Sequence, residues 1–551
     1  MFGNAGTQTN VSDKPPAISL VRRTNSAYVL SAASIVLVVV VAFLVVYRLT
    51  PPRVVGADAP VTEFSGERAL KHLNVIAQTP HPVGTVEHAA VGSYIQNELT
   101  SLGLTPEIQQ TANLTNILVR LKGTVDGKAV LLVAHYDTKP VSPGAGDDGA
   151  AVVGILETLR ALKASQPLRN DVIALFSDGE EVGLLGARAF VYQHSWAKDV
   201  GVVLNFDARG TSGPVIMFET SARNGWLVKE FAKAAPHPTA NSLAPAIFEL
   251  MPNKTDFAVF KERGFDGLNL ANIVGLNHYH TALDNLTNLD HRTLQHQGST
   301  ALALTRRFGN LDLTNPTQDN EVYFDVLNSA IISYSEWWVM PLAVVVCLSF
   351  VALVVLGFKN KHLTGVGLTV GVMAVPLSVV SSVVFLIPLR LLLRKAVATD
   401  ENNLELLLFI VITLCVLLVV SVKLSQKVDV ANLMVGGYFW SLVLLALTCV
   451  FLKGGSYLFT WPLIFNLCAL AFVLAQQRNK FLSNKTLILL VVGAVPGIIL
   501  FSPLVYLTSV ALTLRSIGAS IAIAVMVVLL LGPLTAHFTV VAALRKPVSP
   551  Y

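Results

Sequence analysis

Long apolar segments are the feature that most restricts how this chain can fold. The stretch from Tyr28 to Tyr47 carries no charged residue, and about 20 such residues suffice to cross a bilayer as a helix. Further apolar stretches occur at residues 337–358, 363–389, 406–422, 431–452, 457–475, 486–512 and 517–544. Only 14% of the chain is charged, against about 25% in soluble domains. The sequence therefore predicts a membrane protein with eight spans.

Basic residues predict the orientation of these spans. Arg22 and Arg23 precede the first span, and positive charge collects in cytoplasmic loops, so we expect a cytoplasmic N-terminus. Alternation of the spans then places most basic residues of the second half inside: Lys359, Lys361, Lys423, Lys427, Arg478, Lys480, Lys485, Arg545 and Lys546. The net charge of +5 is attributed to these loops, and no nucleic-acid partner is predicted. Pro496 and Pro503 could divide one span, which would change the count.

The first span has one alternative interpretation, a cleaved signal peptide. Its apolar core is too long for that, and no small-residue cleavage site follows it. We therefore expect a cytoplasmic tail at residues 1–27 and a transmembrane helix at residues 28–48. An extracytoplasmic domain follows at residues 49–330, and a transmembrane domain of about seven helices occupies residues 331–551.

Residues 49–330 differ from the rest of the chain because strand-like and helix-like segments alternate there. Predicted strands are 116–122, 130–134, 172–176, 202–206, 214–219 and 268–272. Predicted helices are 69–77, 86–102, 149–163 and 225–234. Apolar strands that alternate with amphipathic helices are typical of an α/β domain with a central sheet.

Titratable side chains gather where the predicted strands of this region end. His135 and Asp137 follow the strand at 130–134, and Asp147 and Asp148 stand together just before a predicted helix. Ligands collect outside the carboxyl ends of strands in open α/β sheets, and adjacent carboxylates repel each other unless a cation compensates. Taken alone, the first pair could also be a polar loop and the second a helix N-cap.

Three later stretches repeat this pattern. Glu180 and Glu181 follow one strand, Asp207 follows the next, and His278 and His280 follow the last. Each stretch alone is compatible with an acidic turn or a packed histidine. Neighbouring side chains of an extended segment point to opposite sides, so one glutamate can bind a metal while the other faces a reacting water. Histidine and carboxylate donors without cysteine suit zinc or another first-row divalent ion.

The stretches that carry these residues occur in a characteristic order: TPHPVGT, AHYDT, GAGDDGA, GEEVGLLGA, NFDARG, TDF and YHTALD. In this order they resemble metallopeptidase family 28, the co-catalytic dizinc aminopeptidases. The resemblance covers about residues 63–311. It implies a three-layer αβα zinc-exopeptidase domain with a central mixed sheet at residues 49–330, and two Zn²⁺ ions per chain.

The resemblance also implies the metal ligands. His135, Asp147 and Asp207 would bind one zinc, and Asp147, Glu181 and His280 would bind the other, with Asp147 as the bridge. No ligand that the family pattern expects is missing, which argues against the non-catalytic relatives of the family.

The catalytic pair follows from the same resemblance. Glu180 would be the general base, and Asp137 would orient His135, whereas Asp148 and His278 receive no ligand role. The implied activity is removal of N-terminal residues from peptides on the non-cytoplasmic side. A carboxypeptidase or a glutaminyl cyclase on the same scaffold is the alternative, and a receptor or transporter with a binding-only outer domain is an alternative of another class.

The combination of an N-terminal anchor, a lumenal-type domain and a multispan region resembles the endoplasmic-reticulum and vacuolar membrane metallopeptidases of this family. Short loops after Trp337 favour a bacterial inner-membrane protein with a periplasmic catalytic domain, with the endoplasmic-reticulum or vacuolar membrane as the alternative. Among the C-terminal spans, His537 is nearly alone as an ionisable residue away from the ends, which disfavours a transporter. Peptide substrate and lipid bilayer are the expected partners, and the sequence does not indicate an oligomeric state.

Overall fold

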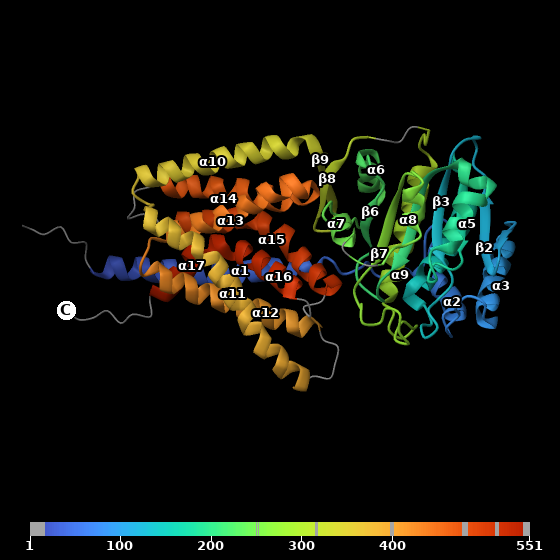
Figure 1. The fold of residues 1–551 in the computed structure, drawn as a ribbon, viewed down its shortest axis with the longest axis horizontal. Coiled ribbons are helices and arrows are strands. Elements are labelled where there is room, and N and C mark those ends of the chain that lie inside the picture. Colours follow the sequence, from blue (N-terminus) through green and yellow to red (C-terminus); the bar gives the residue numbers. More distant parts are fainter. Residues whose placement is uncertain are drawn as a thin grey trace, which may run out of the picture.

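The computed structural model describes an elongated molecule made of two parts (Figure 1). It describes residues 17–249, 251, 253–314, 318–396, 402–475, 483–512 and 517–543. One part, here called the α/β domain, runs from α2 to β9. The other part, the helical bundle, consists of α1 and of the helices from α10 to α17. The two parts lie end to end along the long axis of the molecule.

A seven-stranded mixed sheet forms the centre of the α/β domain, in the order β1-β2-β4-β3-β5-β7-β6. The strands are β1 (Glu107–Thr111), β2 (Leu114–Leu121), β3 (Ala129–His135), β4 (Val172–Ser177), β5 (Val200–Ala208), β6 (Ile216–Thr220) and β7 (Gly267–Asn272). The neighbours β4, β3, β5 and β7 are parallel, and the remaining pairings are antiparallel. The carboxyl ends of these four parallel strands therefore open onto one edge of the sheet.

Helices cover both faces of the sheet because its central strands are apolar on both sides. In β3, Val130 and Leu132 pack into one hydrophobic cluster, whereas Leu131 and Val133 pack into another, because alternate residues of a strand point to opposite faces. The helices of the first face are α2 (Gly66–Ile76), α3 (Val86–Ser101), α4 (Ala151–Lys163), α6 (Gly225–Ala234) and α9 (His291–Gly309), and those of the second are α5 (Leu185–Gln193) and α8 (Phe257–Glu262). The predicted three-layer αβα arrangement is confirmed.

All predicted strands and helices of this domain are present, with ends that differ by a few residues. The sequence does not predict α9, although this helix packs against α4 in the core. Its buried face includes the polar residues Gln295 and His296, which interrupt the apolar period that identifies a helix. The short β1 and the hairpin of β8 (Glu321–Val326) and β9 (Ala330–Ser335) also escape the prediction.

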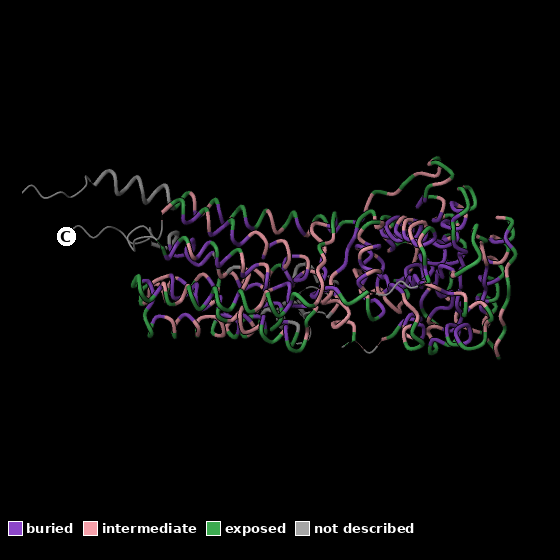
Figure 2. Tube along the Cα trace, turned by 90° about the horizontal axis from the view of Figure 1, so that it is seen from above, coloured by how far each residue is buried: buried purple, intermediate pink, exposed green. Residues whose placement is uncertain are grey.

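Apolar helices form the bundle, and most of them are of membrane-spanning length. They are α1 (Ala17–Tyr47), α10 (Val339–Lys359), α11 (Gly365–Ala396), α12 (Asn402–Ser425), α13 (Val430–Phe451), α14 (Tyr457–Ala475), α15 (Asn484–Leu512), α16 (Ile517–Leu531) and α17 (Thr535–Ala543). Within the described ranges, seven helices are long and apolar enough to cross a bilayer. Figure 2 shows exposed residues along the outer faces of the bundle, whereas the interior of the α/β domain is buried. The chain is a multi-pass membrane protein.

One span differs from expectation. The last predicted span, 517–544, is divided into α16 and α17 by a short 3₁₀ turn, Gly532–Leu534, which contains a proline that cannot continue the hydrogen-bond ladder. The expected count of eight full-length spans is therefore not met within the described residues. In contrast, α15 remains one helix through both Pro496 and Pro503.

The first helix also differs from the prediction at its start. α1 begins at Ala17, before the apolar stretch at Tyr28. Residues 1–16 of the expected cytoplasmic tail lie outside the described residues. The helix therefore includes part of the segment that the sequence assigns to the tail.

The two parts of the molecule are joined by packed contacts as well as by the chain. The ring of Phe324 in β8 stacks on that of Tyr457 at the start of α14, with ring centroids 4.7 Å apart. The Ser242 hydroxyl donates to the carbonyl oxygen of Gly454, at 2.7 Å, just before α14. These contacts fix the α/β domain against one end of the bundle.

Candidate metal centre

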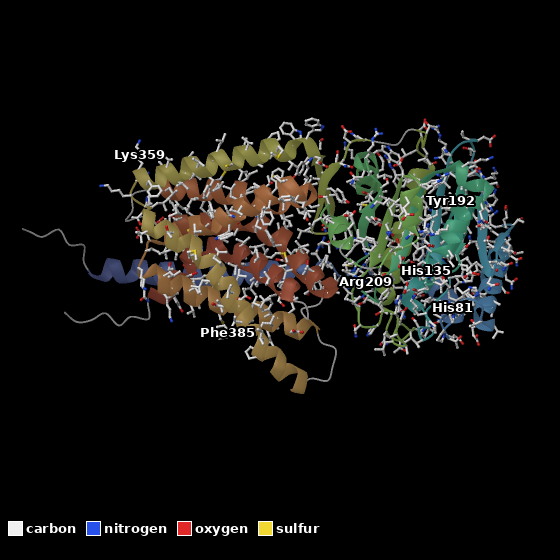
Figure 3. All side chains as sticks on the ribbon, in the orientation of Figure 1. His81, His135, Tyr192, Arg209, Lys359 and Phe385 are labelled. Atoms are coloured by element: carbon white, nitrogen blue, oxygen red, sulfur yellow. The ribbon has the colours of Figure 1, made fainter. Side chains whose placement is uncertain are left out.

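The parallel centre of the sheet brings the predicted site residues to one edge. Each of them ends or follows a parallel strand: His135 ends β3, Asp147 follows β3, Glu180 and Glu181 follow β4, Asp207 lies in β5 and His280 follows β7. Figure 3 shows His135 inside the α/β domain. Residues that are far apart in the sequence lie close together here, because the order of the strands in the sheet differs from their order along the chain.

Two groups of side chains meet the requirements of metal ligands and share Asp147. They are His135, Asp147 and Asp207, and Asp147, Glu181 and His280, and within each group the candidate ligand atoms lie within 4.8 Å of one another. His135 Nε2 lies 3.1 Å from Asp147 Oδ1, and His280 Nε2 lies 3.2 Å from Asp147 Oδ2. The two oxygens of Asp147 thus face different groups, as a bridging carboxylate requires.

Unpaired buried atoms in the second group fit a cation. Glu181 Oε1 and His280 Nε2 lie 3.1 Å apart, yet neither has a hydrogen-bond partner in the described structure. Buried polar atoms are otherwise almost always paired. Imidazole nitrogens and carboxylate oxygens that converge without bonding each other are the donor set that zinc takes. The residues present therefore fit a zinc-type ion.

The electrostatics of the site point the same way. Burial raises the pKa of Asp207 and of Glu180 well above the ordinary carboxyl value, and the repulsion of neighbouring carboxylates adds to this. Burial lowers the pKa of His280, but the carboxylates of Asp147 and Glu181 outweigh it and raise that pKa to about 9. Buried acids of like charge are costly unless a cation compensates them, so this cluster is suited to positive charge.

Asp137 connects the first group to the loop after β4. Its carboxylate accepts hydrogen bonds from the backbone N–H groups of Glu180 and Glu181, at 3.0 and 3.2 Å. His135 Nδ1 lies 3.0 Å from the carbonyl oxygen of Asp137 and 3.5 Å from its carboxylate. Asp137 therefore contacts His135 mainly through its backbone, while its side chain holds the two glutamates in place.

Asp284 is a site residue to which the sequence gives no role. Its Oδ1 accepts from Gly146 N at 2.6 Å, and its Oδ2 accepts from Asp147 N at 3.1 Å. Burial, followed by the charge of Asp147, raises its pKa to about 7. The only sequence signal for Asp284 is its place in the YHTALD stretch, four residues beyond His280.

Other polar side chains support the site without belonging to either group. Lys139 Nζ lies 2.8 Å from Glu181 Oε2, so it holds the outer oxygen of that carboxylate. Asp148 accepts from the backbone N–H of His135 at 3.3 Å.

Two further polar residues have partners outside the candidate groups. Asp256, in the TDF stretch, accepts a hydrogen bond from the Ser177 hydroxyl at the end of β4. His278 Nδ1 lies 2.7 Å from the Thr211 hydroxyl oxygen, so this histidine has a hydrogen-bond partner outside either candidate group.

A pocket opens beside these groups on the side of the helical bundle. It encloses about 950 Å³ of empty space, including its mouth, and Asp147, Glu180 and Asp207 line one part of it. Arg209 also lines it and lies between His135 and the bundle in Figure 3. Most of the other residues that line the pocket are apolar, among them Ile216 in β6 and Ile273 after β7.

Comparison with known proteins identifies part of this chain. Residues 116–305 match the model of peptidase family M28. Endoplasmic reticulum metallopeptidase 1 of Rattus norvegicus is 34% identical over 231 residues, which are 40% of this chain and 26% of that protein. The vacuolar membrane protease of Candida tropicalis is 31% identical over 297 residues, which are 49% of this chain and 32% of that protein.

These alignments span about a quarter to a third of the curated relatives. Among solved structures, the aminopeptidase from Aneurinibacillus sp. strain AM-1 is similar at a TM-score of 0.38 and 12% identity, over 48% of this chain and all of that one. The family match covers the strands β2 to β7 and both groups of candidate ligands. The α/β domain, which stands beside membrane-spanning helices, therefore contains a region similar to the metal-dependent peptidase family M28.

Proposed function

We propose that this chain is a membrane-bound aminopeptidase that uses two zinc ions to remove N-terminal residues from peptides. The observation that carries the proposal is the pair of ligand-type groups that share Asp147 beside a pocket lined by Glu180. In this proposal one zinc is held by His135, Asp147 and Asp207, and the other by Asp147, Glu181 and His280.

Zinc bound at this site would supply Lewis acidity that polarises the scissile carbonyl and acidifies the attacking water. Glu180 lines the pocket and is the residue that would take the proton of this water and return it to the leaving amine. Burial raises its pKa, which suits a carboxylate that must accept and then release a proton. Asp137 holds the backbone of Glu180 and so fixes where this carboxylate acts.

The charge of the pocket supports a preference for free amino termini. Asp147, Glu180 and Asp207 all contribute carboxylates to its lining. The α-ammonium group of a peptide is a cation that such a surface attracts. A blocked N-terminus lacks this charge.

One observation favours a second candidate, a carboxypeptidase on the same scaffold. Arg209 and Lys254 also line the pocket, and guanidinium and ammonium groups recognise a C-terminal carboxylate. The two candidates separate when one peptide is offered free, N-acetylated and C-amidated. Acetylation abolishes cleavage by an aminopeptidase, whereas amidation abolishes cleavage by a carboxypeptidase.

The decisive experiment uses the purified full chain with and without a chelator. We expect chelation to abolish peptide hydrolysis and added zinc to restore it. Glu180→Gln should lower kcat by at least about 100-fold, the usual contribution of a general base, with bound zinc unchanged. The matched control is Glu87→Gln, since Glu87 is an exposed glutamate on α3. Unchanged activity after complete metal removal would disprove the metallopeptidase function.

We also infer that the α/β domain lies on the non-cytoplasmic side of the membrane. Lys359 stands at the end of the bundle farthest from this domain (Figure 3), and positive charge collects on the cytoplasmic side. Thiol labelling of single-cysteine variants in intact membranes tests this: position 126 should react from outside and position 359 only after permeabilisation. Labelling of position 126 only after permeabilisation would reverse the orientation. The relatives described above are endoplasmic-reticulum and vacuolar proteins, so they lend no support to a bacterial inner membrane.

A further inference from the structure

The pocket beside the candidate metal centre has a wall that does not come from the α/β domain. Residues in the last turns of the membrane helix α15 line the same pocket as Asp147, Glu180 and Asp207. They are Leu504, Leu507, Thr508 and Ala511. Figure 1 shows this end of the bundle directed at the α/β domain.

A short helix of the α/β domain, α7 (Ala244–Glu249), packs between α15 and the sheet. Its partly buried Ile247 packs against the hydrophobic cluster that contains Leu504. Its Phe248 packs edge-on against Phe218 of β6, with ring centroids 4.7 Å apart. Ile247 and Phe248 also line the pocket, so α7 and α15 form one continuous apolar wall.

The two ends of the pocket differ in chemistry. The acids and the candidate metal ligands stand at one end, and the wall of α7 and α15 consists mainly of apolar side chains. A peptide whose α-ammonium group and scissile bond lie at the acidic end would direct its first side chain away from those acids. Because apolar area removed from water is stabilising, a large apolar side chain gains most from the wall.

We propose that α15 determines which peptides this enzyme cuts, with Leu507 and Leu504 as specificity-determining residues that contact the side chain of the N-terminal residue. The proposal rests on the aminopeptidase function proposed above. It makes the membrane bundle part of the substrate site, because the α/β domain alone lacks the part of this wall that α15 supplies.

Pocket-filling variants test the proposal through substrate selectivity. In Leu507→Trp, kcat/KM for peptides that begin with Leu or Phe should fall at least about tenfold relative to peptides that begin with Ala, which is the scale of pocket discrimination. Leu507→Ala should raise kcat/KM for peptides that begin with Phe relative to peptides that begin with Leu. The matched control is Val492→Trp, since Val492 is an exposed position of α15 that lies roughly 22 Å earlier along the helix axis.

The ratio between substrates decides this test. A ratio that stays constant in both Leu507 variants, or that changes equally in Val492→Trp, would overturn the proposal. Because each variant is compared with itself on two substrates, partial misfolding lowers both rates and leaves the ratio unaffected.

A crosslinking experiment separates this proposal from the aminopeptidase function. The full-length Glu180→Gln protein in nanodiscs is irradiated with a short peptide whose first residue is photo-leucine, and mass spectrometry locates the adduct. An adduct within residues 504–511 supports the wall even if no peptide is ever hydrolysed. Adducts confined to the α/β domain, or none at all, would contradict it, whereas hydrolysis by the wild-type protein reports on the catalytic function alone.

Discussion

The carboxylate of Asp284 holds the backbone on which Asp147 stands. It accepts hydrogen bonds from the N–H groups of Gly146 and Asp147, at 2.6 and 3.1 Å, and thereby fixes the one residue that both ligand groups share. The site needs both residues. The position of the proposed bridging carboxylate of Asp147 depends on Asp284, which follows it by more than a hundred positions in the chain.

This relationship predicts the effect of Asp284→Asn. An amide replaces one acceptor oxygen by a donor, so at least one of the two backbone N–H groups loses its partner. Residues that support metal ligands in this way commonly contribute 10- to 100-fold in metal affinity, and we expect a loss of about that size in zinc affinity, measured by competition with a chelating dye. Asp126→Asn, in an exposed turn, is the control, and an equal affinity in both variants would refute the role.

Asp137 predicts a different outcome, because it acts on the position of Glu180. In Asp137→Ala both backbone N–H groups of Glu180 and Glu181 lose their carboxylate acceptor. We expect kcat to fall by about 10- to 100-fold while KM changes little, with partial recovery in Asp137→Asn. A uniform loss of folded protein without any change in kcat per bound zinc would instead show a purely structural residue.

The free energy of unfolding should depend on pH through the protonation of His296. Its Nδ1 accepts from Val215 N at 3.1 Å and its Nε2 donates to the carbonyl oxygen of His237 at 3.0 Å, and burial lowers its pKa to about 4. An unfolded histidine has a pKa of about 6.5, so only the unfolded chain takes up this proton between those values. The neutral ring adds about 3 kcal/mol to the free energy of unfolding above pH 6.5, and this contribution disappears as the pH falls toward 4.

Thermal unfolding of the detergent-solubilised protein measures this contribution. The wild-type protein should melt at a lower temperature at pH 5 than at pH 7.5, and His296→Gln should reduce that difference. His291→Gln is the control because His291 is exposed on the same helix. An undiminished pH dependence in His296→Gln would assign the effect to other groups.

Adjacent glycines of α13 provide a matched pair for the packing of the bundle. A Cβ atom at Gly436 would clash with the backbone of Gly371 on α11, whereas a Cβ atom at Gly437 would meet nothing within 4 Å. Small residues allow membrane helices to approach closely. Gly436→Val should therefore destabilise the protein by about 1–3 kcal/mol and lower its melting temperature, and Gly437→Val should not. Equal effects would indicate a general cost of β-branching in this helix.

Much of the α/β domain was predictable because its signals are local. Apolar strands that end in acids and histidines predict both the sheet and the residues at its edge, and the structure brings those residues together. The role of Asp284 could not be predicted, because its partners are backbone N–H groups that any sequence would offer. The helix α9 could not be predicted either, because its buried face carries Gln295 and His296 in place of an apolar stripe.

The relation between the two halves of the chain was beyond reach from sequence for another reason. The hairpin of β8 and β9 and the short helix α7 are too brief to give a periodic signal, yet they connect the α/β domain to α14 and α15. Leu507 is one leucine among many in an apolar helix, and only the packing distinguishes it from its neighbours.

Because the proposed specificity wall of the pocket belongs to a membrane helix, the proposal makes selectivity depend on the lipid. α15 has 29 residues and is about 43 Å long, whereas the hydrocarbon core of a bilayer is about 30 Å thick. Helices of excess length adapt by tilting, and the tilt changes with the thickness of the bilayer. Membranes of different lipid composition would therefore set α15 at different angles to the metal centre, and the same polypeptide would prefer different peptides in each.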